Sequence, residues 1–237
     1  MIIKIVILSI PLVILSTCSL YSQPDLSKCV PVKKSKELEV FVMPSRTQLW
    51  GNVNENLHPA TKFSTGGTFA FVRNRSVLRA GFMYEQKGWS NQMKIIIEDE
   101  FENVAASVNV KIRGTYYYLT LPIQYGWRFG QAVKFEPAIG LYASYLLKST
   151  ITGKQDDGFS SYVNTTDHDN KIDYGFVGSV RVLVPIKSKM AAVIGIYNYL
   201  GLANINGADV PNKSTFRHNV FGLSIGLTVK LKERIFQ

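Results

Sequence analysis

This chain of 237 residues has few cysteines and few long apolar runs, and both scarcities restrict the fold classes open to it. Its two cysteines are Cys18 and Cys29, and removal of the N-terminus would leave Cys29 alone, which excludes a disulfide scaffold. Beyond residue 15, no apolar run approaches the ~18 residues of a membrane helix. Residues 5–15 are apolar except at two positions and follow Lys4, which is typical of a secretory signal peptide. We expect residues 1–22 to be removed before Gln23; lipidation at Cys18 is the alternative.

Acidic residues are also scarce, at 17 Asp and Glu against 27 Lys and Arg, for a net charge of +10. A basic chain raises the possibility of nucleic-acid binding. An exported protein does not normally meet nucleic acid, so we expect no such partner. The basic residues near the start, Lys33, Lys34 and Lys36, are better placed to meet anionic lipid head groups. They fall in a polar segment without periodicity, and residues 23–37 are predicted to be a flexible tail.

Histidine is the third scarcity, and it argues against an enzyme. The chain has three histidines, and none has a serine two residues later, as a lipid A deacylase of the His-x-Ser type would need. The Gly-x-Ser-x-Gly elbow of the hydrolases is also missing. We therefore predict no enzymatic activity, no catalytic residue, no cofactor and no metal.

Long alternation of apolar with small, polar or basic residues is what the chain has in abundance. In residues 221–232 every second residue is apolar. Alternation of this length predicts a strand between two different media, such as lipid outside and a polar lumen inside. The phase of 190–200 stays open, because both of its faces are apolar. Eight segments are predicted as strands: 38–43, 65–72, 77–87, 116–129, 134–148, 172–184, 190–200 and 221–231.

The connections between these segments alternate in length. Tight turns are predicted at residues 74–75, 130–131 and 187–188, and long links at 44–62, 88–115, 149–171 and 201–215. Membrane barrels have short periplasmic turns and long outer loops in this order. The fold predicted for residues 38–237 is therefore an all-β, eight-stranded, antiparallel up-and-down transmembrane β-barrel in a bacterial outer membrane.

Aromatic residues recur at the spacing expected of a lipid-facing band. Tyr117 and Trp127 share one face ten residues apart, and so do Phe135 and Tyr145. Ten residues at ~3.3 Å each, tilted by about 40°, rise about 25 Å, the height of such a band. We predict that these four residues form aromatic girdles in contact with outer-membrane lipid.

Charged residues on the opposite strand faces would point into the barrel. Arg79, Glu136 and Arg181 lie at similar distances from the short turns and are predicted to form an Arg–Glu–Arg cluster, because buried charges must be paired. An eight-stranded barrel is just wide enough for side chains to fill. We expect the cluster to be a structural plug; a proton or ion path is the alternative. The other residues predicted to point inward are Glu85, Lys87, Gln124, Arg128, Asp173 and Lys230.

The second long link has structure of its own. Residues 93–98 and 107–113 both alternate, so the strands on either side are predicted to continue as a hairpin above the membrane. Its tip carries carboxylates, which we interpret as a solvated end and as candidate contacts for protein partners. These residues are Glu98, Asp99, Glu100 and Glu102.

Several segments, in their order along the chain, carry a family resemblance. They are Ala80-Gly-Phe-Met-Tyr-Glu-Gln-Lys-Gly88, Tyr118-Leu-Thr-Leu-Pro-Ile-Gln-Tyr125, Ala138-Ile-Gly-Leu-Tyr142, Asp173-Tyr-Gly175 and Tyr199-Leu-Gly-Leu-Ala-Asn-Ile205. Together they resemble the PorT-like outer-membrane β-barrel family, from about Leu38 to the C-terminus. The resemblance implies a barrel inserted by the barrel-assembly machinery of a Gram-negative bacterium. It also implies, for some members, a part in secretion across the outer membrane, and it supplies no catalytic motif.

The sequence favours a non-enzymatic integral outer-membrane barrel that acts as an envelope anchor or as a membrane component of a secretion assembly. A soluble, secreted, lipocalin-like ligand-binding barrel is an alternative, because alternation alone does not say which face is inside. A small pore or solute receptor is another alternative, disfavoured by the width of the barrel.

Overall fold

The fold is described from a computed structural model, which describes residues 34–52, 57–98, 104–155, 159–206 and 215–231. The predicted signal peptide and residues 23–33 of the predicted tail lie outside these ranges. For residues 95–98 and 104–106 only the backbone is described. No helix in the described parts of the chain is long and apolar enough to cross a membrane.

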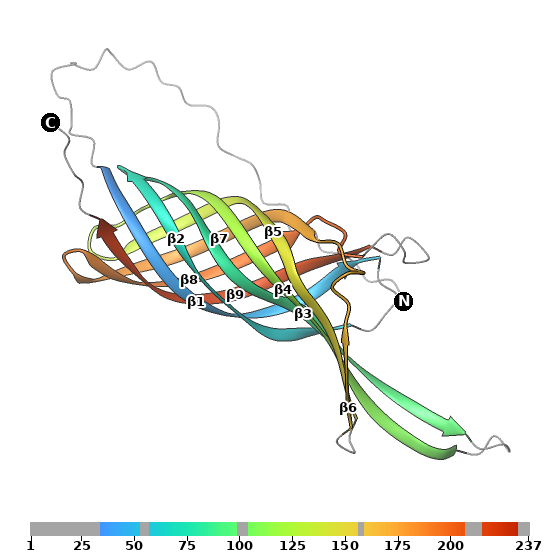
Figure 1. The fold of residues 1–237 in the computed structure, drawn as a ribbon. Helices are drawn as coiled ribbons and strands as arrows, with labels where there is room; N and C mark the ends of the chain where they lie inside the picture. The colour runs from blue at the N-terminus through green and yellow to red at the C-terminus, as the bar shows by residue number, and fades with distance from the viewer. Residues whose placement is uncertain (1–33, 53–56, 99–103, 156–158, 207–214, 232–237) are drawn as a thin grey trace, which may run out of the picture. The chain divides into compact units, whose positions relative to one another are not determined.

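Eight strands form a closed antiparallel ring, as predicted (Figure 1). Neighbouring strands pair in the order β4-β3-β2-β1-β9-β8-β7-β5, and β4 pairs with β5 to close the ring. A ninth strand, β6 (Ser160–Asn164), pairs with β5 alone among the described strands, outside the ring. The ring strands are β1 (Lys34–Gly51), β2 (His58–Arg73), β3 (Ser76–Glu98), β4 (Val104–Trp127), β5 (Lys134–Gln155), β7 (Ile172–Lys187), β8 (Met190–Gly201) and β9 (Phe216–Leu231).

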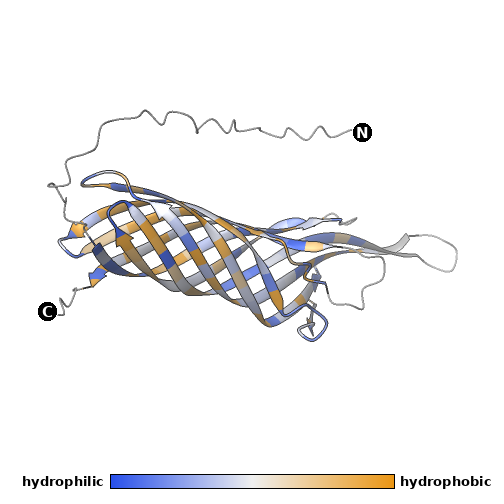
Figure 2. Cartoon of the chain, turned by 90° about the horizontal axis from the view of Figure 1, so that it is seen from above, coloured by the Kyte–Doolittle hydropathy of each residue, from blue (hydrophilic) through white to orange (hydrophobic). Residues whose placement is uncertain are grey.

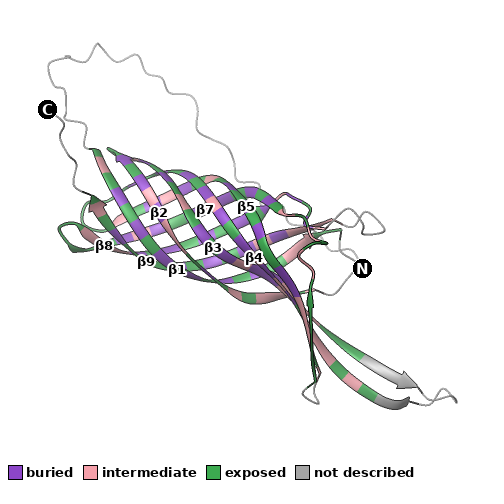
Figure 3. Ribbon diagram, in the orientation of Figure 1, coloured by how far each residue is buried: buried purple, intermediate pink, exposed green. Residues whose placement is uncertain are grey.

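Hydrophobic and hydrophilic residues alternate along the strands (Figure 2), and so do exposed and buried ones (Figure 3). The exposed positions are largely apolar and point outward, whereas the charged residues Arg79, Glu136 and Arg181 are buried inside. On β9, Phe221, Leu223 and Ile225 are exposed, while the intervening residues are mostly buried. The sequence left open which residues of 190–200 face the lumen; the structure shows that Val193 and Tyr197 point inward. A lipocalin-like barrel would hold its apolar face inside, so this arrangement contradicts that alternative.

Two prolines lie inside strands and interrupt the pairing with one neighbour without ending the strand. We ended the first strand before Pro44, yet β1 continues to Gly51 in one register with β9. The pairing skips only from Val42 to Ser45, because proline has no N–H to donate. Pro122 interrupts the β3–β4 pairing in the same way. Proline therefore interrupts these ladders locally without ending the strands.

The strand ends also correct three predicted boundaries. β1 begins at Lys34, so residues 34–37 belong to the barrel rather than to the tail. At one end of the barrel, β2 and β3 are joined by a tight turn in which Asn74 has a positive φ of 56°. At the other end, much of the predicted long links is strand: only residues 52–57 separate β1 from β2, and β3 and β4 pair as far as Glu98 and Val104.

Beyond the ring, the extended strands form a narrow sheet that we call the blade, made of residues 89–98, 104–114, 150–155 and 160–164. It runs past the rim of the barrel and away from the barrel axis (Figure 1). Its strands are continuous with β3, β4 and β5 of the barrel wall, so the wall sets its position.

The outward orientation of Ile139 gives a test of the lipid-facing surface. Ile139 is 67% exposed and lies on β5 between Phe135 and Tyr145. Replacing Ile139 by arginine should destabilise the barrel in lipid vesicles by about 2–4 kcal/mol, measured by urea unfolding, because the charge would enter hydrocarbon. Val163→Arg, on β6 outside the ring, is the matched control and should cost much less. Equal costs for the two variants would contradict the assignment of the lipid-facing surface.

Candidate functional site

The inward side chains at the short-turn end form a cluster of three arginines and three glutamates, which we call the basal cluster. Its members are Glu37, Glu39, Arg79, Arg128, Glu136 and Arg181, and all of them are buried. They come from β1, β3, β5, β7 and the residue after β4. The cluster therefore connects both sides of the ring, and its six formal charges sum to zero.

Glu136 lies at the centre of this cluster. Its Oε1 accepts hydrogen bonds from Arg79 Nη2 at 2.5 Å and Arg181 Nη1 at 3.1 Å, and its Oε2 accepts one from Arg128 Nε at 2.8 Å. Arg79 and Arg181, which we expected at the same depth as Glu136, therefore both contact its carboxylate directly. A fully buried carboxylate with three guanidinium partners is tolerated because each lost water contact is replaced by an ionic hydrogen bond.

Two glutamates of β1 complete the pairing, and the sequence analysis did not place them in the cluster. Arg128 donates from both Nη atoms to Glu37, at 2.9 Å each, and Arg181 donates to Glu39. Glu39 alternates with Leu38 and Val40, and that pattern was a usable signal for an inward position. Glu37 was missed because it was assigned to the tail.

An apolar layer fills the lumen beyond the basal cluster. It consists of buried side chains in mutual contact from opposite sides of the ring: Phe41, Met43, Met83, Tyr142, Val177, Tyr197, Tyr199 and Val220. Tyr142 and Tyr199 meet edge to face with their ring centroids 5.4 Å apart. Methionine and aromatic side chains fill irregular interior space well, so this layer separates the charges on either side of it.

A second buried polar group, which we call the upper cluster, lies on the outer side of this layer. Lys87 Nζ is 2.8 Å from Asp173 Oδ2 and 3.4 Å from Glu85 Oε2, and it lies 4.6 Å from the ring centroid of Tyr142. Asp173 Oδ2 is also 3.4 Å from Nδ1 of His218. Glu85, Lys87 and Asp173 point inward, as the alternation indicated. His218 was missed, because its strand was predicted to begin at Phe221.

The remaining predicted lumen residues also have definite positions. Gln124 is buried and donates to Ser179 at 3.0 Å, whereas Lys230 is only half-buried at the short-turn end. A cavity of about 900 Å³ opens at this end and reaches Glu37 and Arg128. It therefore leads from the mouth of the barrel to the basal cluster.

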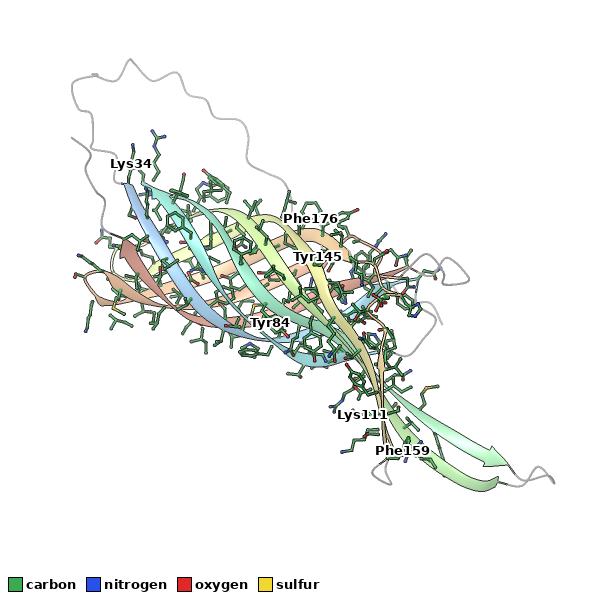
Figure 4. The ribbon with its side chains drawn as sticks, viewed as in Figure 1. Lys34, Tyr84, Lys111, Tyr145, Phe159 and Phe176 are labelled. Carbon is green, nitrogen blue, oxygen red and sulfur yellow. The ribbon has the colours of Figure 1, made fainter. Side chains whose placement is uncertain are left out.

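The aromatic residues predicted to form girdles lie on the outside of the wall. Trp127 and Phe135 are exposed near the short-turn end, and Tyr145 is exposed on the outer part of β5 (Figure 4). Tyr117 stacks on Tyr84, with 6.1 Å between ring centroids. Amphipathic rings at both ends of an apolar band are typical of a barrel wall in a membrane.

The structure does not describe the side chains of the acidic outer-loop residues. Asp99, Glu100 and Glu102 lie outside the described residues, and Glu98 is described by its backbone alone, at the end of β3. Their proposed contacts with protein partners remain a prediction.

The described side chains suit a filled barrel better than a reaction centre. The His218–Asp173 contact resembles part of a catalytic triad, but both side chains are fully buried beneath Tyr116 and Tyr118, which meet the imidazole edge to face. A substrate would have to displace these rings to reach the imidazole. The geometry therefore holds the His218–Asp173 pair in place beneath these rings.

The chain is similar to several solved structures and to one protein family. No curated protein matches the sequence. Solved structures similar to this chain include Neisserial surface protein A (NspA), at 12% identity over 84% of this chain and 99% of that chain, with a TM-score of 0.43. Ail of Yersinia pestis is 8% identical over 83% and 99%, with a TM-score of 0.41. OprG of Pseudomonas aeruginosa is 10% identical over 84% and 97%, with a TM-score of 0.42.

A match to a protein family covers most of the barrel. Residues 41–207, which run from within β1 to beyond the end of β8, match the family described as outer membrane protein beta-barrel domain. The match spans more than half of the chain and includes, in whole or in part, seven of the eight ring strands; β9 lies outside it. The chain therefore belongs to the outer membrane protein beta-barrel domain family.

Proposed function

We propose that this protein is a closed, non-enzymatic barrel that anchors the blade at the outer surface of the outer membrane. The observation that carries the proposal is the stacking of three buried layers in one lumen: the basal cluster, the apolar layer and the upper cluster. Eight strands leave little more room than these side chains occupy. A small pore or a solute receptor would need an open path that this packing does not offer.

The blade supplies the second half of the proposal. Three barrel strands continue into it, with a β-bulge in the β4–β5 pairing at Tyr117/Tyr118, so it is held by the backbone of the wall. A rigid extension beyond a membrane anchor is suited to contact other molecules, because little ordering entropy is lost on binding. In its finer form, the proposal makes the barrel a membrane component of a secretion assembly, supported by the PorT-like resemblance of the sequence.

The basal cluster should stabilise the barrel rather than carry ions. Replacing Glu136 by glutamine leaves three guanidinium groups without their shared carboxylate, at an expected cost of about 3–5 kcal/mol in urea unfolding. Asp167→Asn is the control, because it removes a carboxylate that is 98% exposed and pairs with Lys171 at 3.4 Å. Its cost should stay below about 1 kcal/mol. A Glu136→Gln barrel as stable as the wild type would refute the structural role.

Conductance tests whether the lumen is closed. The purified protein, reconstituted in planar bilayers, should show no stable channel of nanosiemens size, because the layers of buried side chains fill the lumen. A Met43→Ala/Met83→Ala variant, which thins the apolar layer, serves as a comparison. A steady wild-type conductance of nanosiemens size would reject the closed-barrel proposal.

The secretion form of the proposal needs a cellular test. Asn91 pairs with Ile112, so residues 92–111 can be replaced by a two-residue turn that shortens the blade while leaving the ring intact. The shortened protein should still shift in gel migration on boiling, as inserted barrels do, but should not restore secretion to a strain lacking the gene. If the gene deletion leaves the set of secreted proteins unchanged, the secretion role is wrong while the anchor role stands.

A further inference from the structure

One face of the blade carries a row of cations. Lys111 and Arg113 alternate along β4 on the same side as Thr115 and Tyr117, whose neighbours on this face of the barrel wall point to lipid. Lys154 pairs directly with Lys111, and paired residues of adjacent strands share a face. Register places the other cations of this row on the same side: Lys94, which pairs with Asn109, and Lys148, which pairs with Tyr117.

Lys62 of β2 joins this row through a side-chain contact. Its Nζ donates to Thr115 Oγ1 at 2.5 Å. Burial and the neighbouring Arg113 lower the pKa of Lys62 to about 8.

Carboxylates are missing from this face wherever its side chains are described. The other described residues there are Tyr84, Gln86, Gly88, Ser90, Gln92, Ser107, Asn109, Thr115, Tyr117, Thr150, Thr152, Ser160, Tyr162 and Asn164. No described carboxylate forms an ion pair with the cations of the row; Lys148 instead lies over the ring of Tyr162, 5.7 Å from its centroid. A row of like charges, with no carboxylate among the described side chains of its face, is an electrostatic footprint for an anionic partner.

The position of the row relative to the membrane indicates which partner that is. The stacked pair Tyr84–Tyr117 marks the outer end of the lipid-facing wall, and the cations begin immediately beyond it. Figure 4 shows Tyr84 and Lys111 following one another along the same side of the sheet, from the wall onto the blade. The blade leans away from the barrel axis (Figure 1), and by register this side of it continues the outward surface of the wall.

We infer that the cationic face of the blade, made of Lys62, Lys94, Lys111, Arg113, Lys148 and Lys154, binds the phosphorylated head groups of lipids in the outer leaflet. The face continues the lipid-facing surface at the depth where hydrocarbon gives way to head groups. Each Lys or Arg held near an anionic lipid surface adds to the attraction, so six of them form a strong binding surface. An acidic protein partner would approach the blade from solvent and would not require continuity with the lipid-facing wall. The inference is independent of whether the barrel takes part in secretion.

The test compares phosphorylated and dephosphorylated lipid A as probes for the full-length protein in detergent micelles. The wild type should bind the phosphorylated form at least about tenfold more tightly, with an affinity that falls as salt rises. A Lys111→Gln/Arg113→Gln/Lys148→Gln variant should lose at least about tenfold in this affinity. Its control is Lys34→Gln/Lys187→Gln/Lys189→Gln, which removes the same charge at the short-turn end and should bind like the wild type.

Several outcomes would overturn the inference. Equal losses of affinity in the two triple variants would show that only the net charge of the protein matters. Equal binding of both lipid forms would show that the phosphate groups are not recognised. Displacement of the lipid by millimolar inorganic phosphate would mark a site for the free anion instead. A boiling-dependent gel shift checks that each variant is folded. If the blade variant does not fold, the affinities of the wild type for the two lipid forms still test whether the phosphate groups are bound, and equal affinities would overturn the inference.

Discussion

The closure of β1 onto β9 is the constraint on which the structure depends. Within hydrocarbon every backbone N–H and C=O must find its partner in the protein, and a sheet achieves this only when it has no free edge. The β1–β9 ladder extends from Lys36–Leu231 to Gly51–Phe216 and is interrupted only around Pro44. Closure with eight strands also sets the width of the lumen. The requirement that every backbone group be hydrogen-bonded therefore also limits the volume available to interior side chains.

A narrow lumen that carries charges demands pairing, and the basal cluster meets that demand across the ring. Glu136 receives hydrogen bonds from arginines on three different parts of the chain, and two of these arginines reach on to Glu37 and Glu39 of the first strand. Sliding β1 by one residue would turn both glutamates toward lipid and leave the arginines unpaired. The cluster thus favours a single register at the seam where the two ends of the sheet meet.

The alternation in the sequence was sufficient to predict the eight ring strands and the inward direction of Arg79, Glu136 and Arg181. It did not place Glu37 and His218 in the interior, because each lies outside the predicted bounds of its strand; Glu39 lies within a predicted strand, but its inward position was not used. Strand length depends on pairing with a neighbour, as the continuation of β1 past Pro44 shows. Which charges meet across the ring depends on register and barrel width, and neither is encoded within a single strand.

The same alternation has different consequences at different heights along β3, β4 and β5. Within the wall, the outward positions are mostly apolar and meet hydrocarbon; beyond Tyr84 and Tyr117, the outward positions on the same strands become polar and include lysine and arginine. The change follows the change of medium, from acyl chains to head groups and water, without any change of backbone direction. The blade is therefore the part of the wall that has left the hydrocarbon, and its cationic face inherits its orientation from the lipid-facing surface below it. Substitutions in the lumen should alter the stability of this surface without changing which way it faces.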